Sequence, residues 1–168
     1  HVEASFQNEA FVDLVDAALL LEERTPVQGL DRSDALLRQA ECLARLGRRD
    51  DERRAIEASV RCAAARGDRV AECRALRALA AQHQVVSEFE ASRRHAAAAL
   101  ALSRELDDPP STVQSLQALG GALWRLGRGD EARAALEEAL ATAREHGARV
   151  LEARVLAALG ALCGDLLS

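Results

Sequence analysis

The apolar residues of this chain recur every three or four positions over long stretches, which are separated by short polar breaks. Residues 119–140, LGGALWRLGRGDEARAALEEAL, contain two such stretches on either side of a Gly-Arg-Gly break. This spacing places apolar side chains on one face of an α-helix. No segment alternates apolar and polar residues as a half-buried strand does, so the pattern predicts an all-α chain.

The pattern repeats with a period of 40 residues and without gaps. Leucines recur at 36, 76, 116 and 156, and small residues follow four positions later at 40, 80, 120 and 160. Residues 64–83 match residues 144–163 at 9 of 20 positions. Such a period is typical of stacked helical repeats, because a single helix pair cannot bury both of its faces.

The clearest unit predicts two helices, from about residue 111 to 126 and from 130 to 146. Asp130 is the expected N-cap of the second helix, and Gly147 is expected to end that helix. The run 107–110, Asp-Asp-Pro-Pro, predicts a helix stop at the equivalent boundary of the preceding unit.

Small residues predict close contact between the two helices of this unit. Gly120 lies in the first helix, and Ala132 and Ala139 lie in the second, each flanked by leucines. Two helices approach to about 8–10 Å only where one offers a small residue to the bulk of the other. We therefore expect these three positions to lie at the contact.

Applied to the whole chain, the period predicts one domain of about three and a half hairpins. Its expected parts are a leading helix at 7–24, repeats at 31–67, 70–107 and 111–147, and a half repeat or terminal helix at 149–168. The expected apolar face of the leading helix consists of Phe11, Leu14, Val15, Ala18 and Leu19.

Composition narrows the function classes. The chain of 168 residues is 49% hydrophobic but only 2% aromatic, and Ala, Leu, Arg and Glu favour helix. Its net charge is −5 with both signs intermixed, so direct nucleic-acid binding is not expected. No apolar run is long enough to span a bilayer, and the N-terminus lacks a signal-peptide pattern. The absence of Met and the start at His1 suggest a piece of a longer protein.

Cysteine and histidine spacing predicts no metal site. Cys42, Cys62, Cys73 and Cys163 lie in helical, mostly apolar contexts without a metal-ligand spacing, which indicates a reduced, cytoplasmic protein. A disulfide between Cys62 and Cys73 would require a secreted context. His83 and His95 have no Cys or Asp at ligand spacing, and we expect His83 to be a packed imidazole.

No motif predicts catalysis or a cofactor. The carboxylate runs, such as Asp50-Asp51-Glu52 and Glu137-Glu138, fall on expected solvent faces or at helix starts. The segment 120–129 has neither the Lys-Ser/Thr ending nor the preceding strand of a phosphate-binding loop. The chain is therefore not expected to be an enzyme.

Leu119, Gly120, Gly127, Ala132 and Ala139 resemble the tetratricopeptide repeat, which has Leu-Gly in its first helix, Gly at the turn and two Ala in its second helix. The resemblance covers residues 31–168 and is strongest over 111–147. It departs from the pattern at Ala40, Ala80, Glu52, Ser92 and Ser87. It implies a right-handed α-solenoid of antiparallel helix pairs that binds proteins without catalysis.

The length of the period indicates which kind of tetratricopeptide repeat the chain resembles. A period of 40 exceeds the usual 34 and resembles the repeats of large bacterial regulators of the MalT/LuxR class. HEAT repeats have a similar period, but the Gly/Ala pattern favours the tetratricopeptide interpretation. The resemblance implies the regulatory or sensor region of a larger bacterial signalling or transcription-regulatory protein.

In tetratricopeptide solenoids, exposed positions of each first helix line an inner groove that binds a protein segment. Carried over by position, they are Asp34, Glu41, Arg45, Arg74, Arg77, Gln84, Gln114, Gln117, Trp124, Arg125 and Arg154. Beyond the first unit this set is basic and amide-rich, which favours an acidic protein or peptide partner, with Trp124 as an aromatic anchor. Alternatively, the arginines only solubilise the surface and Trp124 packs between helices.

Two other non-catalytic functions remain open. A sensor of small ligands would need a closed apolar pocket with few polar groups. A structural spacer or oligomerisation module would need no ligand. The helix at 149–168 favours self-association, as a homodimer through its wide leucine stripe, or burial under a further helix. The leucines expected at this contact are Leu156, Leu159, Leu162 and Leu166.

Overall fold

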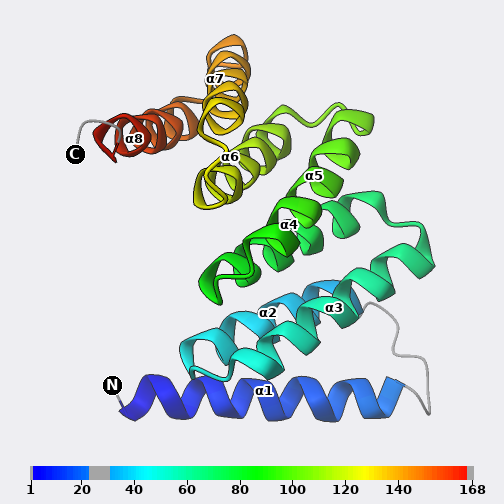
Figure 1. Cartoon of the computed structure of the whole chain (residues 1–168). Coiled ribbons are helices and arrows are strands. Elements are labelled where there is room, and N and C mark those ends of the chain that lie inside the picture. The colour runs from blue at the N-terminus through cyan, green and yellow to red at the C-terminus, as the bar shows by residue number, and fades with distance from the viewer. Residues whose placement is uncertain (1, 23–30, 166–168) are drawn as a thin grey trace. The chain divides into compact units, whose positions relative to one another are not determined.

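The computed structural model describes residues 2–22 and 31–165, with side chains described for 4–21 and 31–162. The described residues form eight helices, with no strand among them (Figure 1). The helices are α1 Val2–Glu22, α2 Arg32–Arg45, α3 Arg49–Arg66, α4 Arg69–Val85, α5 Phe89–Glu105, α6 Pro109–Arg125, α7 Gly129–Glu145 and α8 Arg149–Asp165. The all-α prediction is confirmed.

Tertiary contacts divide the chain into two compact units, and the division falls within α4. The N-terminal unit comprises residues 1–75, and the C-terminal unit comprises residues 76–168. In the N-terminal unit α2 packs against α1 and α3. In the C-terminal unit α6 packs against α5, α7 and α8, and α7 also packs against α8. No helix in the described part of the chain is long and apolar enough to cross a membrane.

The helices are separated by a turn that recurs every 20 residues. Each turn has one residue with positive φ, at Gly47, Gly67, Ser87, Asp107, Gly127 and Gly147. At the α6–α7 turn the Gly127 N–H donates to the Trp124 carbonyl, and the Arg128 N–H donates to the Leu123 carbonyl, both at 2.9 Å. This pair of hydrogen bonds is the Schellman motif, which satisfies the last carbonyls of a helix. The expected helix end at Gly147 is confirmed, since φ is +65° there.

The helix starts differ in part from the prediction. Asp130 was expected to cap α7, but Arg128 occupies the N-cap position and its side chain makes no capping hydrogen bond. The prediction was wrong because α7 begins only two residues after Gly127, which places Asp130 inside the first turn. There its charge still faces the positive end of the helix dipole.

Aspartate caps are present on three other helices, including α4, where Asp68 accepts from the Ala71 N–H at 3.0 Å. Asp31 accepts from the N–H groups of Ser33 and Asp34 at the start of α2, at 3.1 and 3.2 Å. Asp108 accepts from the Ser111 N–H at 3.2 Å, and prolines 109 and 110 fill the first turn of α6. The run 107–110 therefore starts α6 as well as ending α5, because proline fits a first helical turn.

The close contact predicted between α6 and α7 is confirmed. A Cβ atom at Gly120 would lie 2.9 Å from Cγ of Leu136 and 3.3 Å from the Ala132 carbonyl oxygen. Ala132 and Ala139 are fully buried. The surrounding core contains Leu100, Val113, Leu116, Leu123, Leu136, Val155 and Leu162. Residue 120 has no room for a side chain.

Helix α1 buries most of the face expected from the sequence, with Leu14 as the exception. Val12 and Val15 are buried against α2, whereas Leu14 is 65% exposed. Gln39 of α2 fixes this orientation by donating from Nε2 to Oδ1 of Asp16 at 2.6 Å and to the Val12 carbonyl at 3.4 Å. Leu14 is two residues from Val12 and therefore points to the opposite side of the helix. The helix also begins at Val2 rather than at residue 7, and residues 23–24 of the expected helix lie outside the described residues.

The cysteine environments agree with the sequence interpretation where they are described. Cys42 and Cys73 are buried, and Cys62 is half-buried. All three are thiols without a disulfide. The side chain of Cys163 lies outside the described residues.

The substitution Gly120→Leu should lower the free energy of unfolding by about 3 kcal/mol, because a side chain there must displace Leu136 and the α7 backbone. Urea denaturation followed by circular dichroism measures the change. Gly121→Ala is the control, since its Cβ would make an ordinary 3.5 Å contact with Gln84. An unchanged unfolding free energy in Gly120→Leu would contradict the close contact.

The two non-glycine residues with positive φ allow a test of the turn. Ser87 has φ of +62°, so Ser87→Gly should raise the unfolding free energy by about 1 kcal/mol. Gly127→Ser should lower it by a similar amount, because nothing lies within 4 Å of a Cβ there and only the backbone conformation is changed. Equal stability of all three proteins would show that the turn carries no such strain.

Candidate functional site

Within the C-terminal unit, the candidate site is one face of α4, α6 and α8. It is built from positions that recur at 40-residue spacing, so that Arg77 corresponds to Gln117 and Gln84 to Trp124. Of the predicted groove residues, this unit contains Arg77, Gln84, Gln114, Gln117, Trp124, Arg125 and Arg154. The structure uses them in different ways.

Three of these residues bridge α4 and α6. Arg77 donates from Nη1 to Oε1 of Gln114. Gln84 donates from Nε2 to the Ala118 carbonyl at 2.9 Å. All three side chains are half-buried, so each keeps part of its surface exposed while it holds the two helices together. The polar edge of the site is thus organised before any partner binds.

Between α6 and α8 the same face contains a small cavity of about 90 Å³. It is lined by Gln117, Gly120, Gly121, Trp124, Leu136, Ala158, Ala161 and Leu162. The buried Oε1 atom of Gln117 accepts no hydrogen bond from the described residues. A small, mainly apolar cavity with one available acceptor is suited to a short side chain that arrives with a donor nearby.

Trp124 packs between helices, and it also lines the cavity. It is half-buried and packs against the core of α6, α7 and α8, with its ring beside Gly129. The same ring also lines the cavity. It is therefore a structural residue with one side facing the candidate site.

The two remaining arginines of this unit are exposed. The Arg125 guanidinium lies 4.9 Å from the ring centroid of Phe89, which is a cation–π contact with α5. Arg154 lies on α8, one turn before Ala158 of the cavity lining. Arg154 is thus an exposed cation close in sequence to the cavity lining.

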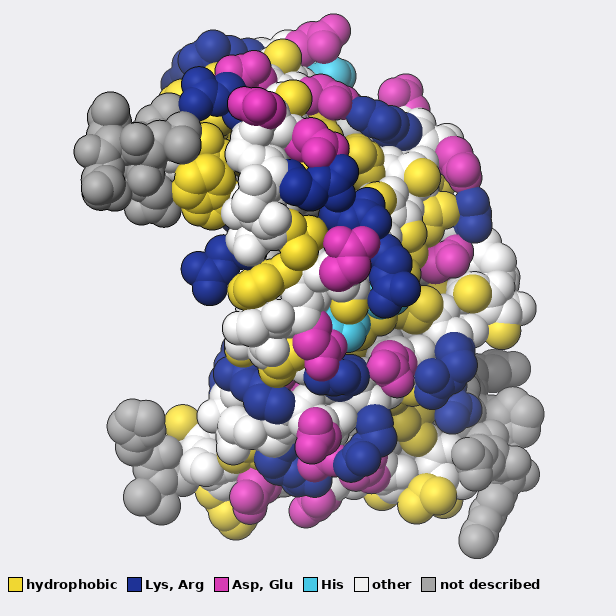
Figure 2. Space-filling model, in the orientation of Figure 1, with side chains coloured by type: hydrophobic (Ala, Val, Ile, Leu, Met, Phe, Trp, Pro, Cys, Tyr) yellow, Lys and Arg dark blue, Asp and Glu magenta, His cyan; other side chains and the backbone are white. Residues whose placement is uncertain are grey.

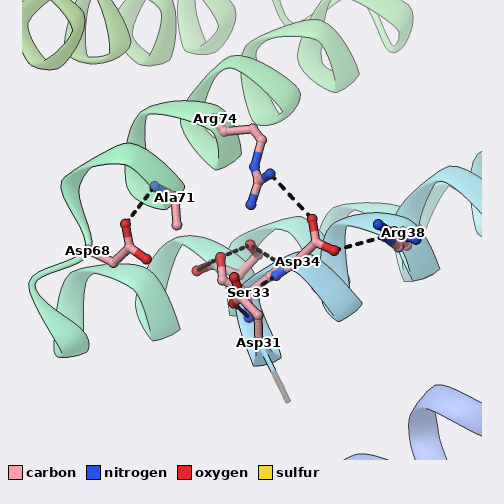
Figure 3. Close-up of polar contacts among 8 residues, drawn as sticks. Asp31, Ser33, Asp34, Arg38, Asp68, Ala71 and Arg74 are labelled. Atoms are coloured by element: carbon pink, nitrogen blue, oxygen red, sulfur yellow. Dashed lines mark hydrogen bonds and ion pairs between the residues drawn. The ribbon is translucent and has the colours of Figure 1, made fainter. Parts of the chain in front are cut away.

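In the N-terminal unit, the predicted groove residues are Asp34, Glu41, Arg45 and Arg74. Asp34 lies between two arginines (Figure 3). Its Oδ1 is 3.3 Å from Nη1 of Arg74, and its Oδ2 accepts from Nε of Arg38 at 2.8 Å. Glu41 and Arg45 are exposed. Arg74, which was expected to face an acidic partner, is thus already paired with Asp34.

The residues expected to mediate self-association are placed differently from one another. Leu162 is buried in the core of the C-terminal unit, and Leu159 is half-buried against the same core. Leu156 is 45% exposed. Leu166 lies outside the described residues. Among the described leucines of this set, only Leu156 is exposed. Self-association stays a prediction.

His83 is a packed imidazole, as expected from the sequence. It is buried, stacks on His95 with ring centroids 5.1 Å apart, and has Nδ1 2.6 Å from Oε2 of Glu88. The described residues contain no group of three His, Cys, Asp or Glu side chains placed to hold a metal ion. The histidine pair is accounted for by packing between α4 and α5.

A second cavity, not anticipated from the sequence, lies in the N-terminal unit. Its volume is about 250 Å³, and it is lined by Val12, Asp16, Leu19, Leu36, Gln39, Leu43, Arg48, Asp51, Arg54, Ala55 and Ala58. The sequence signal for this cavity was Gln39, a glutamine among the apolar residues of one face of α2. Its side chain lines the cavity and bonds to α1.

Surface charges are intermixed rather than gathered by sign. Figure 2 shows arginines and acidic side chains interspersed over the face in view. Many of them pair within one helix turn, as Arg93 does with Glu90 and Arg128 with Glu131. Hydrogen bonds from these arginines hold the pKa values of Glu90 and Glu131 below their ordinary values. Such pairs are exposed and contribute little to stability.

Comparison with known proteins supports the repeat assignment. The tetratricopeptide repeat family model matches residues 71–145. No curated protein matches the chain. A solved Rap protein complexed with competence and sporulation factor is 18% identical, with a TM-score of 0.64 over 84% of this chain. The chain spans 40% of the length of that Rap protein.

Two further solved structures match almost the whole chain. The TPR-like repeats of a putative kinesin light chain from Podosopora anserina are 16% identical, with a TM-score of 0.67, covering 95% of this chain and 89% of that one. BtubC (BKLC) from P. vanneervenii is 15% identical, with a TM-score of 0.62, covering 99% and 84%. These likenesses show that the chain has the fold of TPR-like helical repeats.

The cavity of the N-terminal unit allows a test of its electrostatics. Hydrogen bonds from Arg48 and then Arg54 hold the pKa of Asp51 below its ordinary value. A lowered pKa in the folded state means that the pairing stabilises the fold above the ordinary pKa and is lost as pH falls through the folded value. Arg48→Ala should therefore raise the pKa of Asp51.

A carboxyl-carbon NMR titration measures this pKa directly. Arg38→Ala is the control, because Arg38 pairs with Asp34 instead. An Asp51 titration that is the same in Arg48→Ala and wild type would contradict the assigned pair.

Proposed function

We propose that this chain is a non-catalytic protein-interaction scaffold that binds a protein segment on the α4–α6–α8 face of its C-terminal unit. The observation that carries the proposal is the small cavity beside Trp124 and the row of polar side chains next to it. The TPR family match over 71–145 supports it. So does the solved Rap protein, which is complexed with competence and sporulation factor.

The chemistry of this face favours an acidic segment with one small aliphatic side chain. Arg77 and Arg154 provide cations that can pair with carboxylates, and Arg77 is already positioned by Gln114. The cavity of about 90 Å³ accepts a small side chain, and Oε1 of Gln117 accepts a backbone N–H of the segment. Aromatic surface from Trp124 completes the contact.

The biological setting that we propose is the regulatory or sensor region of a larger bacterial signalling or transcription-regulatory protein in the cytoplasm. The 40-residue period and its resemblance to MalT/LuxR-class regulators support this setting.

A small-ligand sensor is the second candidate, and the cavity of the N-terminal unit is the observation that favours it. Its volume of about 250 Å³ is just below the range of roughly 300–1,000 Å³ found for ligand pockets. Its lining includes Asp16, Arg48, Asp51 and Arg54, so it is more charged than the apolar pocket expected of such a sensor. Protein binding is therefore the better-supported function.

A peptide-array experiment tests the proposed function. The labelled chain is applied to random 12-residue peptides, and the peptides that bind are titrated while Trp124 emission is recorded. Binders should be enriched in Asp and Glu, and Ala161→Leu should weaken them at least tenfold, because a leucine there fills the cavity.

Ala141→Leu is the matched control, since it adds the same side chain on exposed α7 surface away from the cavity lining. Binding that Ala161→Leu leaves unchanged, or an array without binders, would contradict the proposed site.

A further inference from the structure

Helices α1 and α8 each carry exposed apolar residues in addition to the face that they bury. In α1, Val12 and Val15 are buried against α2, yet Phe6, Leu14 and Leu21 are 73%, 65% and 62% exposed. In α8, Val155 and Leu162 are buried in the core, yet Leu156, which lies about 100° around the helix from Val155, is 45% exposed. A helix that is apolar all round is normally buried all round.

The exposed face of α8 carries the same residue types as the face of α6 that packs against α7. Leu116 and Gly120 of α6 are buried at that contact, and their equivalents 40 residues later are Leu156 and Gly160. A Cβ atom at Gly160 would have no neighbour within 4 Å, whereas at Gly120 it would meet Leu136 at 2.9 Å. Ala153, the equivalent of the buried Val113, is also exposed. The described residues leave this face of α8 open.

The helix that fits such a face is defined by α7. Its contact residues are small at 132, 139 and 143, with Leu136 over the glycine. The required pattern is therefore a small residue, a leucine four residues later and a small residue three further on. This pattern in α7 is already used inside its own unit, because all four positions are buried.

The exposed face of α1 repeats the pattern. Ala10, Leu14 and Ala17 have the spacing of Ala132, Leu136 and Ala139, and all three are exposed. Leu21 follows at the position of Ala143, where it departs from α7 by being large, and it is also exposed. One chain therefore carries an open small-residue face on α8 and an exposed helix face of matching pattern on α1.

We propose that the chain associates head to tail, with the α1 face Ala10-Leu14-Ala17-Leu21 of one copy packed on the α8 face Ala153-Leu156-Gly160 of another. Leu14 then occupies the site over Gly160 that Leu136 occupies over Gly120. The contact joins two different faces, so it is heterologous and leaves one face open at each end of a dimer. It uses neither the cavity nor the polar row of the proposed binding site.

Complementary variants test this arrangement by sedimentation velocity. Wild type should associate in a concentration-dependent way at micromolar concentration. Leu14→Glu and Leu156→Glu should each weaken association at least tenfold. An equimolar mixture of the two variants should form a dimer that does not grow, because each variant retains the face that the other has lost.

Further variants separate this contact from loss of folding and from general stickiness. Gly160→Leu should block close approach and abolish association without lowering the stability to urea, since its side chain enters open space in the single chain and leucine favours helix more than glycine does. Val85→Glu replaces another exposed apolar residue and should leave association unchanged. These two results would support the contact.

Three results would overturn the proposal. The first is a wild-type chain that stays monomeric at high micromolar concentration. The second is association that Leu14→Glu does not weaken, which would indicate a two-fold contact between α8 helices. The third is a mixture of Leu14→Glu and Leu156→Glu that stays monomeric, which would show that the two faces do not recognise each other.

Discussion

The structure depends on one recurring constraint, a left-handed residue every 20 positions. At each turn this residue lets two backbone N–H groups reach back to the carbonyls of the ending helix, and a new helix begins two residues later. From α4 to α8 this leaves helices of 17 residues each. Equal helices joined by equal turns place every second helix in an equivalent environment. The period of 40 is the consequence.

Equivalence of position, not identity of residue, is what the repeat preserves. The position of Gly120 is occupied by Ala40 in α2, and both are buried at contacts between neighbouring helices. Between α2 and α3 the close approach is made by two serines, with Oγ of Ser33 and Oγ of Ser59 2.7 Å apart. A pair of serines and a glycine both provide the small side chains that two helices need in order to pack closely. This tolerance explains why the repeat is strong in spacing and weak in sequence identity.

The sequence predicted the features that follow from the spacing of residues along the chain. It did not predict the features that depend on which side chains meet in the fold. Helix type, the left-handed Gly147 and the contact at Gly120 follow from periodicity and from local sterics. The exposure of Leu14 does not, because α1 is apolar on both sides and its rotation is fixed by Gln39 of α2. For the candidate site, the sequence predicted Gln117 and Trp124 as groove positions. It could not show that they share a cavity with Ala158 and Ala161, since that requires the spacing between α6 and α8.

The placement of the leucines in α8 links the repeat to its surfaces. Leu162 belongs to the core. Leu156 corresponds to Leu116, which lies on the face of α6 that packs against α7. The cavity lining of Ala158, Ala161 and Leu162 adjoins the core, and Leu162 belongs to both. Residues of these surfaces are interleaved in sequence, so the neighbouring helices divide one wide apolar stripe into a covered side, with its cavity, and the exposed side of Leu156. A helix in a repeat can therefore pack against its own unit and still present an apolar surface, because the two use different directions around one axis.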